Sequence, residues 1–167
     1  MMGAGKTTIG RALARKLGLA FADADKELVT RTGAAVATIF EIEGEAGFRK
    51  RESALLVELA AGENAVIATG GGVVLVEENR KVMRERGTVV YLRARLESLW
   101  ERTRQDTSRP LLRTPDPKKT LADLMEQRDP LYREAAHVVV DTGSQSAATL
   151  VSRVVTALNQ HSPGKAA

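Results

Sequence analysis

The sequence predicts an α/β protein built on a doubly wound parallel sheet, and three observations lead to this fold class. A Gly-rich segment opens directly into an amphipathic helix, short apolar runs recur along the chain, and amphipathic helical stretches separate them. Apolar runs without polar alternation are typical of strands that helices cover on both faces. Strands that alternate with helices favour a parallel sheet whose ligands bind beyond the carboxyl ends of the strands.

The individual elements follow from periodicity. Ile9, Leu13 and Leu17 recur at helical spacing, so the first helix is expected at 6–17, with Gly18 as its stop signal. The buried strands are expected at 65–68, 89–92 and 138–140, with a weaker one at 19–22. Further helices are expected at 79–86, 96–103 and 121–132, and a last one over 147–158.

Two segments interrupt this alternation. Residues 34–61 form a mostly helical insertion that Gly44 and Gly47 are expected to break. Residues 105–117 are polar and contain three prolines, and this length without a regular element predicts a mobile cover over a binding site. Residues 1–160 thus form one domain, and residues 161–167 are expected to be a disordered tail.

Composition excludes several classes of protein. The chain of 167 residues has no Cys and two distant His, which excludes disulfides and thiolate metal sites and suits a reducing cytoplasm. It has neither a signal peptide nor an apolar run of the ~20 residues that would span a membrane. The net charge of +4 is modest and only 4% of the residues are aromatic, which disfavours nucleic-acid binding. A small anionic substrate explains the positive charge equally well. We expect a monomer without membrane or nucleic-acid partners.

The segment Gly3-Ala4-Gly5-Lys6-Thr7-Thr8 precedes the first helix in the manner of a phosphate-binding loop. Backbone N–H groups and the helix N-terminus bind phosphate, Lys6 reaches the β- and γ-phosphates, and the Thr7 hydroxyl binds Mg²⁺. The alternative is a plain Gly-rich tail ahead of a helix.

The complete pattern of this loop is G-x-x-x-x-G-K-[ST], and its first glycine would lie one position ahead of Met1. Such loops also follow a buried strand. We therefore expect that the first strand of the sheet is missing, which would leave a gap between the strands at 65–68 and 88–92 and destabilise the fold.

Two further motifs lie where strands are expected to end. Asp23 and Asp25 follow the weak strand, and can bind Mg²⁺ and a substrate hydroxyl, unless they are solvated carboxylates with Asp25 as a helix N-cap. Three glycines follow Thr69, so their backbone amides are open to a ligand.

Arginines lie beside apolar residues in F-R, S-R-P-L-L and L-Y-R, although a single arginine is more often a surface charge.

Taken in order, the segments G-A-G-K-T-T-I-G-R, D-A-D, I-F-E-I-E-G-E-x-x-F-R-x-x-E, T-G-G-G, S-R-P-L-L and P-L-Y-R resemble the shikimate kinase family over residues 3–141. The resemblance implies a P-loop kinase fold with strand order 2-3-1-4-5. It also implies an ATP- and Mg²⁺-dependent enzyme that phosphorylates the 3-hydroxyl of shikimate in aromatic amino-acid biosynthesis.

The resemblance assigns roles to individual residues. ATP contacts fall on Gly3, Ala4, Gly5, Lys6, Thr7, Thr8, Arg102 and Arg109. Shikimate contacts fall on Asp25, Arg49, Gly71, Gly72 and Arg133, with Arg49 and Arg133 on its carboxylate. Thr7 and Asp23 would bind the metal, and Lys6, Asp23 and Arg109 would act in catalysis, with Arg109 on the mobile cover. Phe40 and Phe48 would wall the shikimate site, and Glu52 would orient Arg49.

Two alternative functions stay open at this stage. One is another small-molecule kinase of the gluconate type, from which the I-F…G-E…F-R block and the later R-P-L-L and L-Y-R segments separate the shikimate kinase family. The other is a module that binds nucleotide without turnover.

Overall fold

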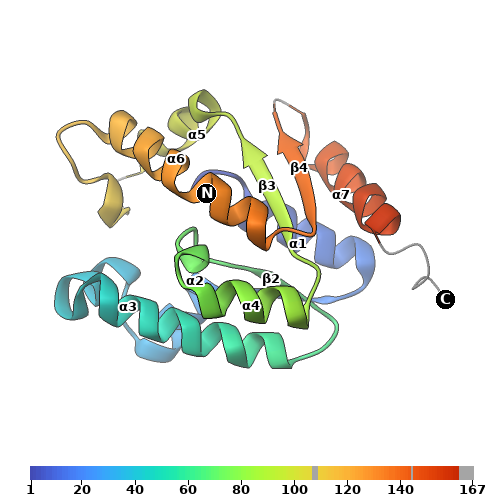
Figure 1. Ribbon diagram of the computed structural model, residues 1–167, viewed down its shortest axis with the longest axis horizontal. Coiled ribbons are helices and arrows are strands. Elements are labelled where there is room, and N and C mark those ends of the chain that lie inside the picture. Colours follow the sequence, from blue (N-terminus) through green and yellow to red (C-terminus); the bar gives the residue numbers. More distant parts are fainter. Residues whose placement is uncertain (107–108, 144, 162–167) are drawn as a thin grey trace.

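The structure is a computed structural model that describes residues 1–106, 109–143 and 145–161 (Figure 1). Its helices are α1 (Lys6–Leu17), α2 (Ala24–Thr32), α3 (Val36–Ala61), α4 (Glu77–Arg86), α5 (Leu96–Thr103), α6 (Pro117–Ala135) and α7 (Ala147–His161). Its strands are β1 (Ala20–Asp23), β2 (Ala65–Ala68), β3 (Val90–Ala94) and β4 (Val138–Thr142). Short 3-10 turns lie at Val73–Leu75 and Pro110–Leu112.

The strands are parallel, as predicted, but in the described part of the chain they form two sheets of two strands each. β1 pairs with β2, from Ala20 opposite Ala65 to Asp23 opposite Ala68, and β3 pairs with β4. A cavity of about 660 Å³ separates the pairs and is bordered by β2, β3, α1 and α7. Among the described residues, β2 and β3 each have one edge that pairs with no other strand. The predicted loss of a first strand stays a prediction.

Helices cover both faces of the strands. α1 packs on β1 and β2 and also on α7, which packs on β4. α4 contacts both α3 and α6, and Figure 1 shows α4 and α6 in front of the strands with α1 behind them. The main core lies between these layers, and Leu99 and Leu121 are fully buried in it. A smaller core under α2 and α3 contains Leu28, Ile39, Phe48 and Leu55, so the insertion packs on its own apolar cluster.

Most elements lie where the sequence predicts them, and the differences have local causes. β1 begins one residue later than expected and runs through Asp23, while α6 begins at Pro117 rather than at residue 121. Asp116 caps α6 by accepting a hydrogen bond from Lys119 N at 3.0 Å, and Pro117 favours a first helical turn.

The prediction of two breaks in the insertion is half wrong. Gly44 does interrupt α3, with a φ of 69°, whereas Gly47 remains helical. One left-handed residue is enough to turn the chain, and the helix resumes directly after it. The predicted mobile cover includes residues 107 and 108, and the predicted disordered tail includes residues 162–167, all of which lie outside the described residues.

Candidate functional site

The phosphate loop curls around the N-terminus of α1. Gly5 precedes the helix with a φ of 87° and Gly3 has a φ of 72°, backbone conformations that favour glycine. The Lys6 ammonium lies inside the loop and donates to the Met1 carbonyl oxygen at 2.7 Å. Burial lowers the pKa of Lys6, and the negative charge of Asp25 opposes this shift. The loop therefore holds a desolvated cation beside a helix N-terminus, the arrangement that binds phosphate.

The residues predicted to bind the metal come together. The Thr7 hydroxyl donates to Asp23 Oδ2 at 2.7 Å, while Asp23 Oδ1 accepts from Lys26 N at 3.2 Å. Asp23, not Asp25, is therefore the N-cap of α2, which fixes its carboxylate toward the loop. The described residues contain no cluster of three acidic or His side chains that could hold a metal alone. A hydroxyl and one carboxylate suit Mg²⁺, which keeps several waters and takes substrate phosphates as ligands.

Side chains approach the backbone of two of the three glycines after β2 closely. A Cβ at Gly70 would lie 2.3 Å from Glu52 Oε1 and 3.0 Å from Asp25 Oδ1. A Cβ at Gly72 would lie 2.2 Å from the guanidinium of Arg49. The predicted turn thus brings together one acid from α2 with an acid and a base from α3, and a side chain at Gly70 or Gly72 would displace them.

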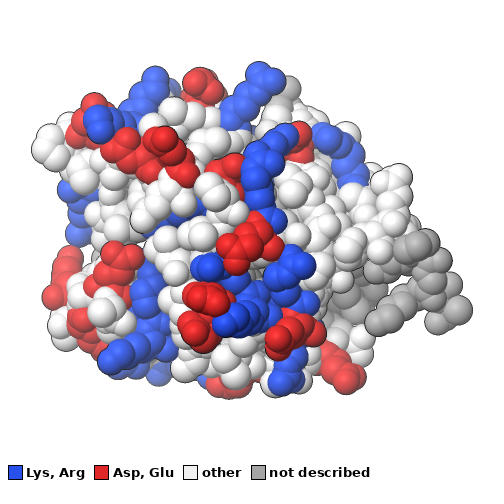
Figure 2. Space-filling view, in the orientation of Figure 1, with Lys and Arg blue, Asp and Glu red and all other residues white. Residues whose placement is uncertain are grey.

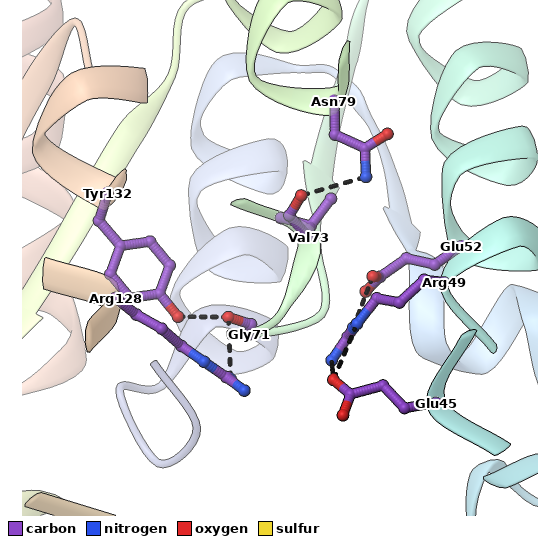
Figure 3. A network of polar contacts seen from close by, with 8 residues as sticks. All are labelled: Glu45, Arg49, Glu52, Gly71, Val73, Asn79, Arg128 and Tyr132. Atoms are coloured by element: carbon purple, nitrogen blue, oxygen red, sulfur yellow. Dashed lines mark hydrogen bonds and ion pairs between the residues drawn. The ribbon is translucent and has the colours of Figure 1, made fainter. Parts of the chain in front are cut away.

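Arg49 enters the site from α3 and is held from two sides (Figure 3). Its guanidinium pairs with Glu52 at 2.7 Å and with Glu45 at 2.9 Å, and its side chain is 12% exposed. It also lies over the Phe48 ring, 5.3 Å from the centroid, and Phe48 packs on Phe40. Glu52 is therefore in direct contact with Arg49, as its predicted orienting role requires.

The second arginine of the site is Arg128, which the sequence reading missed. Arg128 is 2% exposed and its Nη1 donates to the Gly71 carbonyl oxygen at 3.3 Å. In Figure 3 its guanidinium and that of Arg49 approach the same space from opposite sides of Gly71. Arg133, predicted for this role, is instead 47% exposed and pairs with Asp129 at 2.6 Å. The two lie on different faces of α6 because they are five residues apart.

The spacing of the buried residues in α6 indicates that Arg128, and not Arg133, faces the core. Its buried residues are Leu121, Arg128, Tyr132 and Ala135. These recur at helical spacing, so Arg128 occupies the core-facing stripe, and a charged residue there must have partners. Arg133 falls outside the stripe.

Two carboxyls of the site, those of Asp25 and Glu52, have pKa values above the ordinary ones. Asp25 is open to solvent on one side, but the surrounding protein desolvates its carboxylate and raises its pKa, against the opposing charge of Lys6. Burial also raises the pKa of Glu52, which is 5% exposed, against the attraction of Arg49. The opposing positive charge thus comes from Lys6 of the phosphate loop for Asp25 and from Arg49 of α3 for Glu52.

The two remaining predicted ATP contacts border the loop. Arg102 donates to the carbonyl oxygens of Gly3, at 3.2 Å, and Gly143, at 3.3 Å, and so links the phosphate loop to the segment after β4. Arg109 forms an ion pair with Asp106 at 2.8 Å, and its charge acts on both Lys6 and Asp25. The site thus combines a phosphate loop, a candidate metal pair, one free face of a carboxylate and two inward arginines.

Parallel strands followed by helices, with a Gly-Lys-Thr loop at the first helix, define a P-loop domain of the small-molecule kinase class. The family model described as shikimate kinase matches residues 2–159. The chain belongs to the shikimate kinase family.

Relatives and solved structures agree with this membership. A shikimate kinase of Burkholderia pseudomallei is 58% identical over 155 residues, covering 93% of this chain and 84% of the relative. One of Bordetella avium is 55% identical over 161 residues, covering 96% and 77%. The structure of shikimate kinase from Acinetobacter baumannii in complex with shikimate is similar with a TM-score of 0.93 and 45% identity, covering 95% of this chain and 89% of that one. The structure of shikimate kinase from Aquifex aeolicus is similar with a TM-score of 0.85 and 36% identity, and the match covers 97% of this chain and 94% of that one.

Proposed function

We propose that this protein transfers the γ-phosphate of ATP to the 3-hydroxyl of shikimate. One observation carries the proposal: the glycine turn after β2 lies between the two halves of the site. A Cβ at Gly71 would lie 3.4 Å from Met2 N of the phosphate loop, and Cβ atoms at Gly70 and Gly72 would meet Asp25 and Arg49, so the phosphate loop and the arginine pair border one site. A carboxylate-binding end joined to a phosphate-binding end matches a substrate that bears both a carboxylate and a hydroxyl. The relative of known structure that binds shikimate supports the choice of substrate.

In this proposal the shikimate carboxylate lies between Arg49 and Arg128. Both guanidiniums are largely buried and lie on opposite sides of Gly71, which supports a two-sided fork on one anion. Glu52 and Glu45 keep Arg49 extended, and the amides of Gly71 and Gly72 add backbone donors. Asp25 accepts from a ring hydroxyl and orients the 3-hydroxyl toward the phosphate.

ATP lies with its phosphates in the loop, and its Mg²⁺ is bound by Thr7 and Asp23. The metal neutralises phosphate charge when bound, and Lys6 and Arg109 add fixed positive charge where negative charge spreads in the transition state. Arg102 gives the adenine a surface to stack on. Asp23 can accept the hydroxyl proton, but positioning and charge account for most of the rate in a loose transition state.

Steady-state kinetics test the proposal. ADP release, followed in a coupled assay with Mg²⁺, should depend on shikimate, and omitting Mg²⁺ or adding a chelator should abolish it. Replacing shikimate with gluconate should give no release above background. Turnover of gluconate would favour the alternative kinase, while nucleotide binding without any release would favour a non-catalytic module.

The acid side of the pH profile should report the two raised carboxyls. Asp25 accepts a hydroxyl hydrogen bond more strongly when it is ionised, and its pKa is raised above the ordinary 3.8. Because Asp25 binds its proton at a higher pH than an ordinary aspartate, kcat/KM for shikimate should decrease as the pH is lowered, with a midpoint above pH 3.8. The titration of shikimate itself and the fold of the protein, by circular dichroism, are measured as controls. Constant kcat/KM down to pH 4 would contradict the assignment of Asp25.

We further propose a monomeric enzyme of the cytoplasm. The absence of Cys fits a reducing compartment. No helix among the described residues is long and apolar enough to cross a membrane. Analytical ultracentrifugation at the assay concentration tests the monomer.

A further inference from the structure

The Gly71 carbonyl oxygen is bound by two side chains of α6. Arg128 donates to it at 3.3 Å, and the Tyr132 hydroxyl donates to it as well (Figure 3). A Cβ at Gly71 would lie 3.6 Å from the Tyr132 oxygen and 3.4 Å from Met2 N. Gly71 therefore lies between α6 and the phosphate loop, at ordinary contact distance from both.

Tyr132 is itself held in place from behind. It is 8% exposed and stacks on Tyr91, with ring centroids 4.8 Å apart and planes at 25°. The Tyr91 hydroxyl donates to Asp129 Oδ1 at 2.8 Å, and Asp129 Oδ2 accepts from Arg133 Nε at 2.6 Å. Tyr91 therefore supports Tyr132 through its ring, while its hydroxyl binds Asp129 and not Gly71.

The state of the phenol suits this task. Burial raises the pKa of Tyr132 to about 12, so the hydroxyl stays protonated and remains a donor at neutral pH. A hydrogen-bond donor on a rigid, stacked ring loses little side-chain entropy when it binds a fixed acceptor.

Three successive glycines have no side chains to hold their backbone, and glycine has the widest choice of conformations. The Gly71 carbonyl and the Gly72 N–H belong to one planar peptide unit. The two side-chain contacts on this carbonyl therefore help to orient the Gly72 amide, together with the backbone hydrogen bonds from Val73 N to Gly70 O and from Leu75 N to Gly72 O. Because Arg128 shares the same acceptor, the position of the Gly71 carbonyl also sets the position of the guanidinium. One hydrogen bond from Tyr132 therefore acts on two groups of the site.

We propose that Tyr132 is a positioning residue for shikimate recognition, which acts through the Gly71 carbonyl on the Gly72 amide and on Arg128. The proposal rests on the proposed function, because it assumes that these groups bind shikimate.

The test compares Tyr132→Phe with Tyr91→Phe as a matched control. Both variants keep the ring stack and lose one hydroxyl, but only Tyr132 donates to Gly71. Losing one hydrogen bond to a buried acceptor should raise KM for shikimate about five- to tenfold in Tyr132→Phe. The kcat and the KM for ATP should change less than twofold, and Tyr91→Phe should change KM for shikimate less than twofold. A purely structural role would lower the melting temperature without this split.

Arg128→Ala separates the two levels of the proposal. If Arg128→Ala raises KM for shikimate and a folded Tyr132→Phe does not, Tyr132 has no positioning role and the proposed function stands. If Arg128→Ala leaves KM unchanged, the proposed binding mode itself is wrong. If both phenylalanine variants raise KM equally, the effect comes from the ring stack and the inference about the Gly71 carbonyl is overturned.

Discussion

Replacing Lys6 with alanine should lower kcat by at least two to three orders of magnitude. Lys6 is the desolvated cation of the phosphate loop, and its Nζ already lies inside the loop at 2.7 Å from the Met1 carbonyl oxygen. A charge contact made in the transition state within a dry site is worth ~3 kcal/mol or more. The measurement is single-turnover phosphoryl transfer at saturating ATP and shikimate, which separates chemistry from product release.

Lys16→Ala is the matched control for this variant. Lys16 lies on the same helix, is exposed and donates to Ser152, so its loss should leave kcat within twofold. Comparable kcat values for the Lys6 and Lys16 variants, with both proteins folded, would remove Lys6 from the chemistry.

Removing either inward arginine should weaken shikimate binding far more than ATP binding. Arg49→Ala or Arg128→Ala breaks a charge-assisted fork and leaves its partners desolvated, Glu52 for Arg49 and the Gly71 carbonyl for Arg128. Such truncations cost ~2 to 5 kcal/mol, or roughly 30- to 5,000-fold in Kd. Lysine at either position should restore little, because an ammonium cannot form a bidentate contact with a carboxylate. Isothermal titration with shikimate and, separately, with ADP measures both affinities.

Arg133→Ala is the control that distinguishes the structure from the sequence-based expectation. Arg133 is exposed and pairs with Asp129, so its loss should change the Kd for shikimate no more than threefold. A loss at Arg133 as large as that at Arg128 would return the carboxylate contact to Arg133 and contradict the geometry of α6.

The phosphate loop could be predicted from its own residues because it depends on short-range chemistry, whereas the roles predicted for Asp23 and Arg49 follow from the family resemblance. A Gly-Lys-Thr segment ahead of a helix fixes its own geometry, and an aspartate at the end of a strand must face the loop. Arg128 could have been found too, since it lies in the buried stripe of α6 with Leu121 and Tyr132. The motif P-L-Y-R favours its terminal residue, Arg133, whereas the helical periodicity of α6 favours Arg128.

Other features could not be found from local patterns. The pairing of strands into two separate sheets depends on contacts between distant residues, and apolar runs locate strands without stating their neighbours. The need for glycine at Gly70 and Gly72 comes from Glu52 and Arg49, which approach from another helix. Sequence indicates an open turn there, whereas the reason for it is tertiary.

The central claim is that one site joins the phosphate loop to a two-arginine carboxylate fork built from Arg49 and Arg128. The most direct test is a double-mutant cycle on shikimate affinity with Arg49→Ala, Arg128→Ala and the double variant, because residues that bind one carboxylate must be coupled. We expect a coupling free energy of at least ~1 kcal/mol, with ADP affinity unchanged in all three variants. Strictly additive losses, or a loss of ADP affinity equal to that of shikimate, would contradict the account.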